Sequence, residues 1–254
     1  MSGRSFPGWT GPPPAGVVVD LDDTIYPQAT YLRGAVSEVG RAAQAAGLDG
    51  EAVCRALRSE IHAGSDRNGT IDRALARCAV PPDQAAKITP VLVRAFVGYR
   101  PERLPLYEDA GAALAALRTR YPLACLTDGN PVIQRAKLAA TGIVDAVDLV
   151  VITDELGGRA RRKPHPAGLL RIADRFGVRA EDLVVIGDRP SKDIAAAVAV
   201  GARSIRVGTG EYAAAGDLPP ATVSVPNLVT AASLLCSLVQ GPEVRRAPAP
   251  QSAR

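Results

Sequence analysis

The sequence predicts an α/β protein: a doubly wound, Rossmann-like parallel sheet with a small all-helical domain inserted after the first strand. Helical patterns separate the later strand candidates, and this alternation is typical of doubly wound folds. The strand candidates themselves are short and nearly purely apolar, as expected for strands buried on both faces of a parallel sheet. They are VVVD at 17–20, LACLT at 123–127, LVVIT at 149–153, LVVIGD at 183–188 and SIRV at 204–207.

The helices between the later strands are marked by residues that start or stop helices. Asn130 can cap a helix that begins at the following proline. The stretch 166–177 begins with proline, keeps apolar residues at helical spacing and ends at glycine. A third helix is expected to start near Ser191, with Ile194 and Val198 facing inward.

The region 28–100 contains no convincing strand. Leu32, Val36, Val39 and Ala43 keep the spacing of one helix face, and further helical stretches follow at 50–62, 69–79 and 83–97. We therefore expect a helical domain over 28–100 and an α/β core formed by 17–27 and 101–240. The ends, 1–16 and 241–254, are rich in Pro, Gly, Ser and Arg and are expected to be disordered.

Composition excludes several classes of function. The chain has 254 residues, 47% of them hydrophobic, which is enough for a substantial core. A formal charge of only +4 and 4% aromatic residues argue against a nucleic acid polymer as partner. No apolar stretch is long enough for a membrane span or resembles a signal peptide, and the four cysteines are far apart. We expect a cytoplasmic protein with reduced thiols.

Polar and charged residues that could act in catalysis or metal binding lie at the ends of the predicted strands. Asp20 and Asp22 follow the first strand, Thr127 ends the second, and Asp188 ends the fourth. Lys163 lies in the loop after the third. Ligands of open parallel sheets bind beyond the carboxyl ends of the strands, so these residues are expected to meet although they are distant in sequence.

Four motifs occur in order: D-x-D-x-T at 20–24, an apolar run ending in Thr127, the pair Lys163-Pro164, and G-D-x-x-x-x-D at 187–193. This set resembles the haloacid dehalogenase superfamily of aspartate-nucleophile hydrolases, most of which are phosphatases. The resemblance covers about 17–210, and no motif position departs from the pattern. A helical insertion after the first motif is similar in placement to the small mobile cap of this superfamily.

The resemblance implies a role for each motif residue. Asp20 would be the nucleophile, and Asp22 the general acid and base. Lys163 would stabilise the negative charge of nucleophile and phosphoryl group. The hydroxyl of Thr127 and the backbone N–H of Asp128 would bind the phosphoryl oxygens.

The resemblance also implies a metal site. A carboxylate can attack a phosphate dianion only if their repulsion is offset, and a hard divalent cation with oxygen ligands does so. Mg²⁺ is expected, held by Asp20, the backbone carbonyl of Asp22, and Asp188. Asp193 would orient the motif lysine through a salt bridge, and Thr24 would support the turn after the first strand.

These observations predict a Mg²⁺-dependent phosphatase that hydrolyses a small phosphorylated metabolite through an aspartyl-phosphate, as a monomer or homodimer. A phosphomutase of the same fold would use the same aspartates, and a non-catalytic phospho-ligand-binding protein is a further alternative. A dehalogenase is less favoured because it does not need the acid/base Asp22. The sequence does not select one phosphoester among small metabolites.

Overall fold

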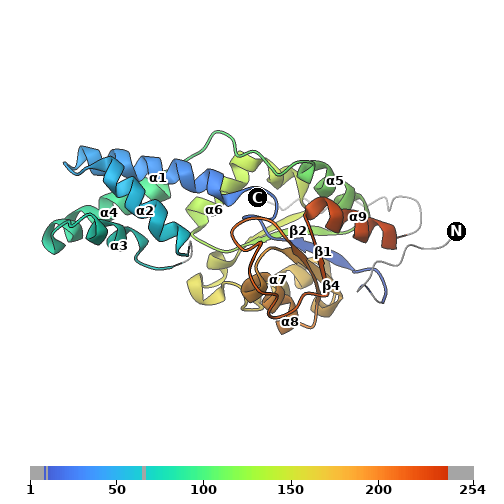
Figure 1. The fold of residues 1–254 in the computed structure, drawn as a ribbon. Coiled ribbons are helices and arrows are strands. Elements are labelled where there is room, and N and C mark those ends of the chain that lie inside the picture. Colours follow the sequence, from blue (N-terminus) through green and yellow to red (C-terminus); the bar gives the residue numbers. More distant parts are fainter. Residues whose placement is uncertain (1–8, 10, 65–66, 240–254) are drawn as a thin grey trace, which may run out of the picture. The chain divides into compact units, whose positions relative to one another are not determined.

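The computed structural model describes residues 9, 11–64 and 67–239, and its centre is a six-stranded parallel sheet (Figure 1). The strand order is β3-β2-β1-β4-β5-β6. The chain thus builds outward from β1 in both directions, as in a doubly wound fold. The strands are β1 Gly16–Val19, β2 Leu123–Thr127, β3 Leu149–Ile152, β4 Leu183–Gly187, β5 Arg203–Val207 and β6 Val223–Val225.

The register of the central strands brings their carboxyl ends together. Val19, the last residue of β1, pairs with Cys125 of β2 and with Ile186 of β4. The backbone N–H of Asp20 continues the ladder and donates to the carbonyl of Ile186 over 2.9 Å. The residues that follow β1, β2 and β4 are therefore placed at one edge of the sheet.

Helices cover both faces of this sheet (Figure 1). Leu169 and Ile172 of α7 pack with Val18, Leu126 and Val185 in a buried core cluster. On the other face, α9 lies against α5, where the Tyr121 hydroxyl donates to a carbonyl of α9 over 2.7 Å. These helices are α5 Ala110–Arg120, α7 Ala167–Phe176, α8 Ala195–Ala199 and α9 Leu228–Leu238. Short 3-10 turns occupy Ile143–Ala146, Thr153–Leu156, Gly158–Arg161 and Ala180–Asp182.

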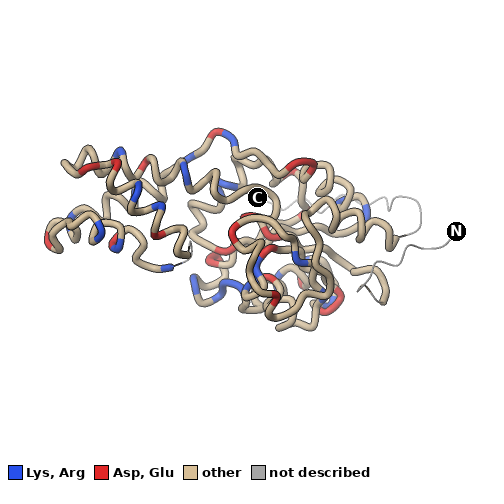
Figure 2. The backbone as a smooth tube through the Cα atoms, viewed as in Figure 1, with Lys and Arg blue, Asp and Glu red and all other residues tan. Residues whose placement is uncertain are grey.

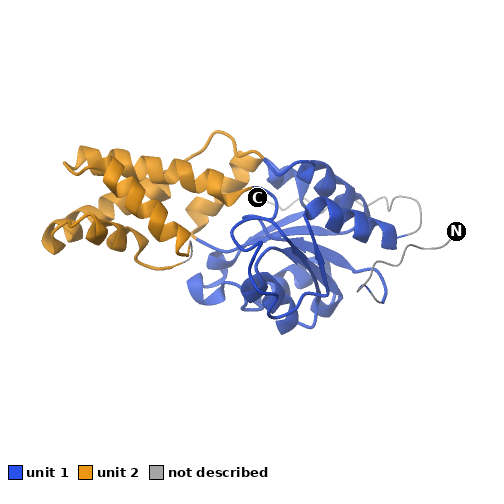
Figure 3. Ribbon diagram, viewed as in Figure 1, with its two compact units in different colours: residues 1–26, 106–129, 142–254 blue, residues 27–105, 130–141 orange. Residues whose placement is uncertain are grey.

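A second compact unit is entirely helical (Figure 3). Its core is built from the apolar faces expected from helical spacing, including Val36, Val39, Leu57 and Leu92. The carboxylate of Asp49 caps one helix by accepting from the backbone N–H of Ala52 at 2.9 Å. Its helices are α1 Gln28–Ala45, α2 Gly50–His62, α3 Thr70–Arg77, α4 Pro82–Gly98 and α6 Pro131–Thr141.

The two units divide the chain differently from the predicted domains. The helical unit comprises Pro27–Pro105 and Asn130–Thr141, whereas the sequence pattern assigns 130–141 to the α/β core. Two contacts explain the grouping. The backbone N–H of Leu104 donates to the carbonyl of Ala140 over 2.9 Å, and the ammonium of Lys137 lies 4.9 Å from the ring centre of Tyr31.

The longer of the two helical segments leaves and re-enters the α/β unit at neighbouring residues. The backbone N–H of Tyr107 donates to the carbonyl of Ile25 over 3.0 Å, and both residues belong to this unit. The long helical insertion between them is therefore closed at its base by a hydrogen bond of the α/β unit itself.

One local expectation is wrong, and one strand is missing from the sequence prediction. Val198 is 57% exposed rather than inward-facing, because Pro190–Ile194 forms a wider π-helical turn that shifts the buried face to Ala196 and Ala197. The strand β6 was not predicted at all, since Val223–Val225 is too short to give a pattern.

The N-terminal segment also differs from its predicted disorder in the part that is described. Trp9 is only 8% exposed, and the guanidinium of Arg203 lies 4.3 Å from its ring centre. Gly16 already belongs to β1. The other segment expected to be disordered, 241–254, lies outside the described residues.

Basic and acidic residues are interspersed along the helical unit (Figure 2). Several form ion pairs there, including Glu60 with both Arg73 and Arg77. Among the described residues, no helix combines the length and hydropathy that a membrane crossing requires.

Candidate active site

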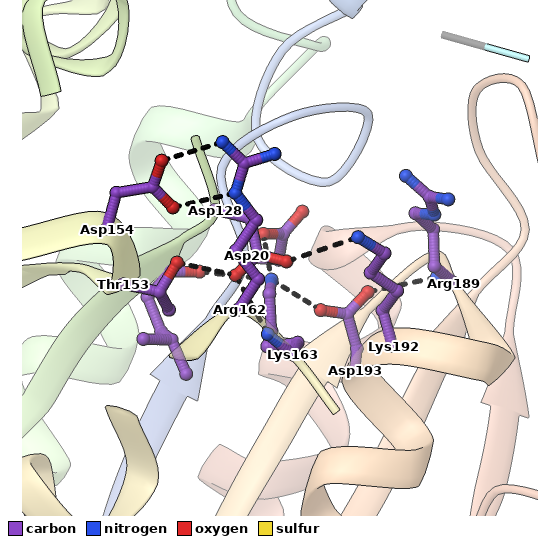
Figure 4. Close-up of polar contacts among 10 residues, drawn as sticks. Asp20, Asp128, Thr153, Asp154, Arg162, Lys163, Arg189, Lys192 and Asp193 are labelled. Carbon is purple, nitrogen blue, oxygen red and sulfur yellow. Dashed lines mark hydrogen bonds and ion pairs between the residues drawn. The ribbon is translucent and has the colours of Figure 1, made fainter. Parts of the chain in front are cut away.

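Asp20, directly after β1, is the centre of a buried polar cluster at the carboxyl edge of the sheet (Figure 4). Its Oδ1 atom lies 2.5 Å from Nζ of Lys163. The lysine ammonium also donates to Oδ1 of Asp193 at 2.6 Å and to the carbonyl of Leu126 at 3.3 Å. The ammonium therefore has three acceptors within reach, two of which are carboxyl oxygens.

Asp193 is held in place by its backbone surroundings. Its Oδ2 atom accepts from the backbone N–H of Arg189 at 3.0 Å, which leaves Oδ1 for Lys163. A Cβ atom at Gly187 would collide with the Asp193 carboxyl group. The glycine before Asp188 is therefore needed so that the Asp193 side chain can lie against the end of β4.

Asp188 has a different environment. Both of its carboxylate oxygens are buried, and neither has a hydrogen-bond partner within the described part of the chain. One carboxylate oxygen from each of Asp20, Asp188 and Asp193 lies within 4.8 Å of the others. Both oxygens of Asp193 are already hydrogen-bonded, so Asp20 and Asp188 are the carboxylates available to a cation. Oxygen ligands and a negative net charge fit Mg²⁺.

Asp22 lies outside that carboxylate cluster. Its Oδ1 atom accepts from the hydroxyl of the fully buried Tyr26 at 2.6 Å. The two residues also form an isolated backbone bridge, so the turn after β1 folds back on itself. Sequence reasoning missed Tyr26, because a tyrosine after isoleucine in an apolar context is indistinguishable from a core residue.

The turn is also held by the loop that follows β5. Asp23 has a positive φ of 58°, and its backbone carbonyl accepts from the Thr209 hydroxyl at 2.5 Å. Its side chain accepts from the backbone N–H of Glu211 at 3.1 Å. A Cβ atom at Gly210 would overlap the Asp23 side chain. Thr24 is buried beside this clasp, and its hydroxyl has no hydrogen-bond partner among the described residues.

Thr127 ends β2, the strand beside β1, and Asp128 follows it. Thr127 is buried and pairs with Ile152 of β3. The Oδ1 atom of Asp128 accepts from the hydroxyl of Thr153 at 2.9 Å. The structure thus brings together all the predicted site residues of the α/β unit: Asp20, Asp22, Thr24, Thr127, Asp128, Lys163, Asp188 and Asp193 are placed around the ends of β1, β2 and β4.

Burial strongly shifts the protonation of these carboxylates. Burial, opposed by the charge of Lys163, raises the pKa of Asp20 to about 8. Burial, reinforced by the charge of Asp193, raises the pKa of Asp188 to about 9. Burial alone would lower the pKa of Lys163, but Asp193 and Asp20 hold this pKa well above its usual value. The lysine therefore stays charged, and the carboxylates need a further positive charge to ionise fully near neutral pH.

The chain is similar in sequence to known hydrolases. The sequence model of the haloacid dehalogenase-like hydrolases matches residues 14–201. Glyceraldehyde 3-phosphate phosphatase of Methanopyrus kandleri is 32% identical over 202 residues, which are 77% of this chain and 84% of that protein. Phosphoserine phosphatase of Thermus thermophilus is 36% identical over 149 residues, but the match covers only 58% of this chain and 57% of that protein.

A solved structure shows the same fold. The crystal structure of a predicted phosphoglycolate phosphatase from Haemophilus somnus superimposes with a TM-score of 0.64. The alignment covers 87% of this chain and 97% of that one, at 18% sequence identity.

Proposed function

The chain belongs to the haloacid dehalogenase-like hydrolases, and we propose that it is a Mg²⁺-dependent phosphatase that hydrolyses a small phosphomonoester through an aspartyl-phosphate. The observation that carries this proposal is the placement of Lys163 between Asp20 and Asp193, beside an Asp188 carboxylate whose oxygens have no hydrogen-bond partner among the described residues. The names of the similar phosphatases support hydrolysis of a phosphomonoester.

In the first step, a carboxylate oxygen of Asp20 attacks phosphorus and the bond to the leaving-group oxygen breaks. Asp22 gives its proton to that oxygen, so an alcohol departs. The Tyr26 hydroxyl, 2.6 Å from Asp22 Oδ1, orients the carboxyl group of Asp22 toward the leaving-group oxygen. The ammonium of Lys163 neutralises charge on Asp20 and on the phosphoryl oxygens.

In the second step, water attacks the phosphorus of the aspartyl-phosphate. Asp22, now ionised, takes a proton from this water, and the bond between Asp20 and phosphorus breaks. Phosphate leaves, and both aspartates return to their starting states. The hydroxyl of Thr127 and the backbone N–H of Asp128 are proposed to hold the phosphoryl oxygens in both steps. Both groups lie at the carboxyl end of β2, the strand beside β1.

The donor set fits the expected metal. Asp20 and Asp188 would hold Mg²⁺, with the backbone carbonyl of Asp22 as a third ligand. When bound, the ion offsets the repulsion between nucleophile and phosphate dianion. The buried, unsatisfied oxygens of Asp188 are the observation that supports this site.

We also propose that the helical unit serves as a cap that restricts the enzyme to small phosphoesters. Its main segment, Pro27–Pro105, is inserted directly after the turn that carries Asp20 and Asp22. Limited proteolysis should cut near Pro27 and near 101–105 and leave a resistant helical fragment. A digest without cleavage at either place would count against the cap.

The proposed function is tested by phosphate release from a panel of small phosphomonoesters, with Mg²⁺ or with EDTA. Release is expected with Mg²⁺ only, and Asp20→Asn should abolish it while the fold is retained. Product analysis separates a phosphatase from a phosphomutase, which returns an isomeric phosphoester instead of free phosphate. Phosphate release by Asp20→Asn at the wild-type rate would refute the role of Asp20 as nucleophile.

A further inference from the structure

The side chain of Asp128 connects three segments of the active site through one oxygen atom (Figure 4). Its Oδ1 accepts from the Thr153 hydroxyl at 2.9 Å and from the backbone N–H of Lys163 at 3.0 Å. Thr153 directly follows β3, and Asp128 directly follows β2. One carboxylate oxygen thus joins the ends of two strands to the backbone of the motif lysine.

The position of Lys163 in the chain explains why such a contact matters. The residue lies in a turn between the 3-10 turn Gly158–Arg161 and α7, so no strand or helix ladder fixes its backbone. Its side chain is long, and a small rotation of the backbone would displace the ammonium by much more. Holding the N–H of Lys163 at the end of β2 limits where Nζ can lie relative to Asp20.

We propose that the side chain of Asp128 is a positioning residue, which fixes the backbone of Lys163 so that its ammonium is aimed at Asp20. This inference rests on the proposed function and adds a side-chain role to the backbone N–H already assigned to Asp128. The proposed role requires that Oδ1 of Asp128 accepts hydrogen bonds, and it does not require the negative charge of the Asp128 side chain. The second oxygen, Oδ2, lies 3.5 Å from Nζ of Lys192 and is the weaker contact.

A neighbouring ion pair provides a matched control. Asp154 accepts from Arg162 through both carboxylate oxygens, at 2.7 and 2.6 Å. This pair fastens the same loop one residue earlier than the Asp128 contact does. Asp154→Asn therefore loosens the loop without removing the hydrogen bond to the Lys163 backbone.

The experiment compares Asp128→Ala, Asp128→Asn and Asp154→Asn with the wild type by steady-state phosphate release. Asp128→Ala should lower kcat about 10- to 100-fold with little change in KM, as loss of a supporting hydrogen bond does in other sites. Asp128→Asn keeps an oxygen that can accept both bonds, so it should restore kcat to within about threefold of wild type. Asp154→Asn should keep wild-type kcat while losing thermal stability.

Two results would overturn the inference: wild-type kcat in Asp128→Ala, or equal impairment of Asp128→Asn and Asp128→Ala. If Asp128→Ala does not fold, Thr153→Val decides, because it removes the other donor to the same oxygen. A lowered kcat at unchanged KM in that variant supports the positioning role, and an unchanged kcat contradicts it.

Hydrogen exchange of the Lys163 amide gives a readout that does not depend on turnover. Protection is expected in the wild type, Asp128→Asn and Asp154→Asn, and its loss is expected in Asp128→Ala. Unchanged protection in Asp128→Ala would overturn the inference even in an active enzyme. A wild-type protein that releases no phosphate would refute the proposed function. Hydrogen exchange of the Lys163 amide would still decide whether Asp128 holds the Lys163 backbone.

Discussion

The ammonium of Lys163 lies 2.5 Å from a carboxylate oxygen of Asp20, although 143 residues separate the two in the chain. The parallel sheet makes this contact possible, since Asp20 directly follows β1, one of its central strands. The same ammonium lies 2.6 Å from Asp193, so one buried cation is shared by two buried carboxyl groups. Removing any one of these three groups changes the electrostatic environment of the other two.

Replacing the shared cation should damage both stability and activity. In Lys163→Met, Asp20 and Asp193 lose their common partner. Breaking a buried ion pair should lower the free energy of unfolding by about 3 kcal/mol. This is the low end of the usual range for such pairs, because Asp20 can take up a proton. Turnover should fall by more than about 100-fold. Urea denaturation and phosphate release measure the two effects. Asp20→Asn is the control: it should lose turnover but keep stability, and equal unfolding free energies for Lys163→Met and wild type would contradict the prediction.

The carboxylate of Asp188 should oppose stability until a cation is bound. We expect Asp188→Asn to melt at a higher temperature than the metal-free wild type. It removes a buried carboxyl group that lacks hydrogen-bond partners among the described residues and that the metal-free fold must protonate at a cost in free energy. The variant should also lose the rise in melting temperature that Mg²⁺ gives the wild type. Differential scanning calorimetry with and without Mg²⁺ tests both effects. Asp174→Asn, whose side chain is 74% exposed, makes the same charge change on the surface and should leave both unaltered.

As pH rises, the affinity for Mg²⁺ should increase while the free energy of unfolding without metal decreases. The pKa values of Asp20 and Asp188 are raised from 3.8 to about 8 and about 9, so between those limits the folded chain holds protons that the unfolded chain has released. The free energy of unfolding without metal should therefore fall as pH rises through this window, and level off above it. Mg²⁺ must displace the same protons, so its affinity should rise with pH. Titration calorimetry at about pH 6 and about pH 8.5 measures this, and equal affinities would sink the idea.

The clasp between Asp23 and the loop after β5 should be sensitive to one added methyl group. Gly210 has a φ of +72° and no room for a Cβ atom beside Asp23. Gly210→Ala should therefore cost more than about 1 kcal/mol of unfolding free energy and lower turnover, because the turn that carries Asp22 shifts. Gly216→Ala is the matched control, since an added Cβ there meets no atom within 4 Å. Denaturation curves and kcat that are alike for both variants would show that the clasp is dispensable.

The sequence predicts the strands β1 to β5 and the helical insertion well, because buried parallel strands and amphipathic helices leave clear periodic patterns. It does not predict the short β6, the outward turn of Val198 or the burial of Trp9, since each depends on neighbours distant in the chain. The site shows the same division. Motif residues such as Asp20 are visible in the sequence, whereas the contact of Tyr26 with Asp22 and that of Asp128 with Lys163 are visible only once the turns are folded.

The hydrogen bond from Tyr107 to Ile25 also has an evolutionary consequence. A segment whose two ends meet at its base can be lengthened, shortened or exchanged without moving the strands on either side. The register of β1 with β2 and β4 would survive such an exchange, and with it the position of Asp20, the proposed nucleophile. Recombination at this junction would therefore exchange the main segment of the proposed cap, Pro27–Pro105, while α6 and the sheet stay unchanged. Lineages could in this way diversify their substrates while the proposed chemistry stays the same.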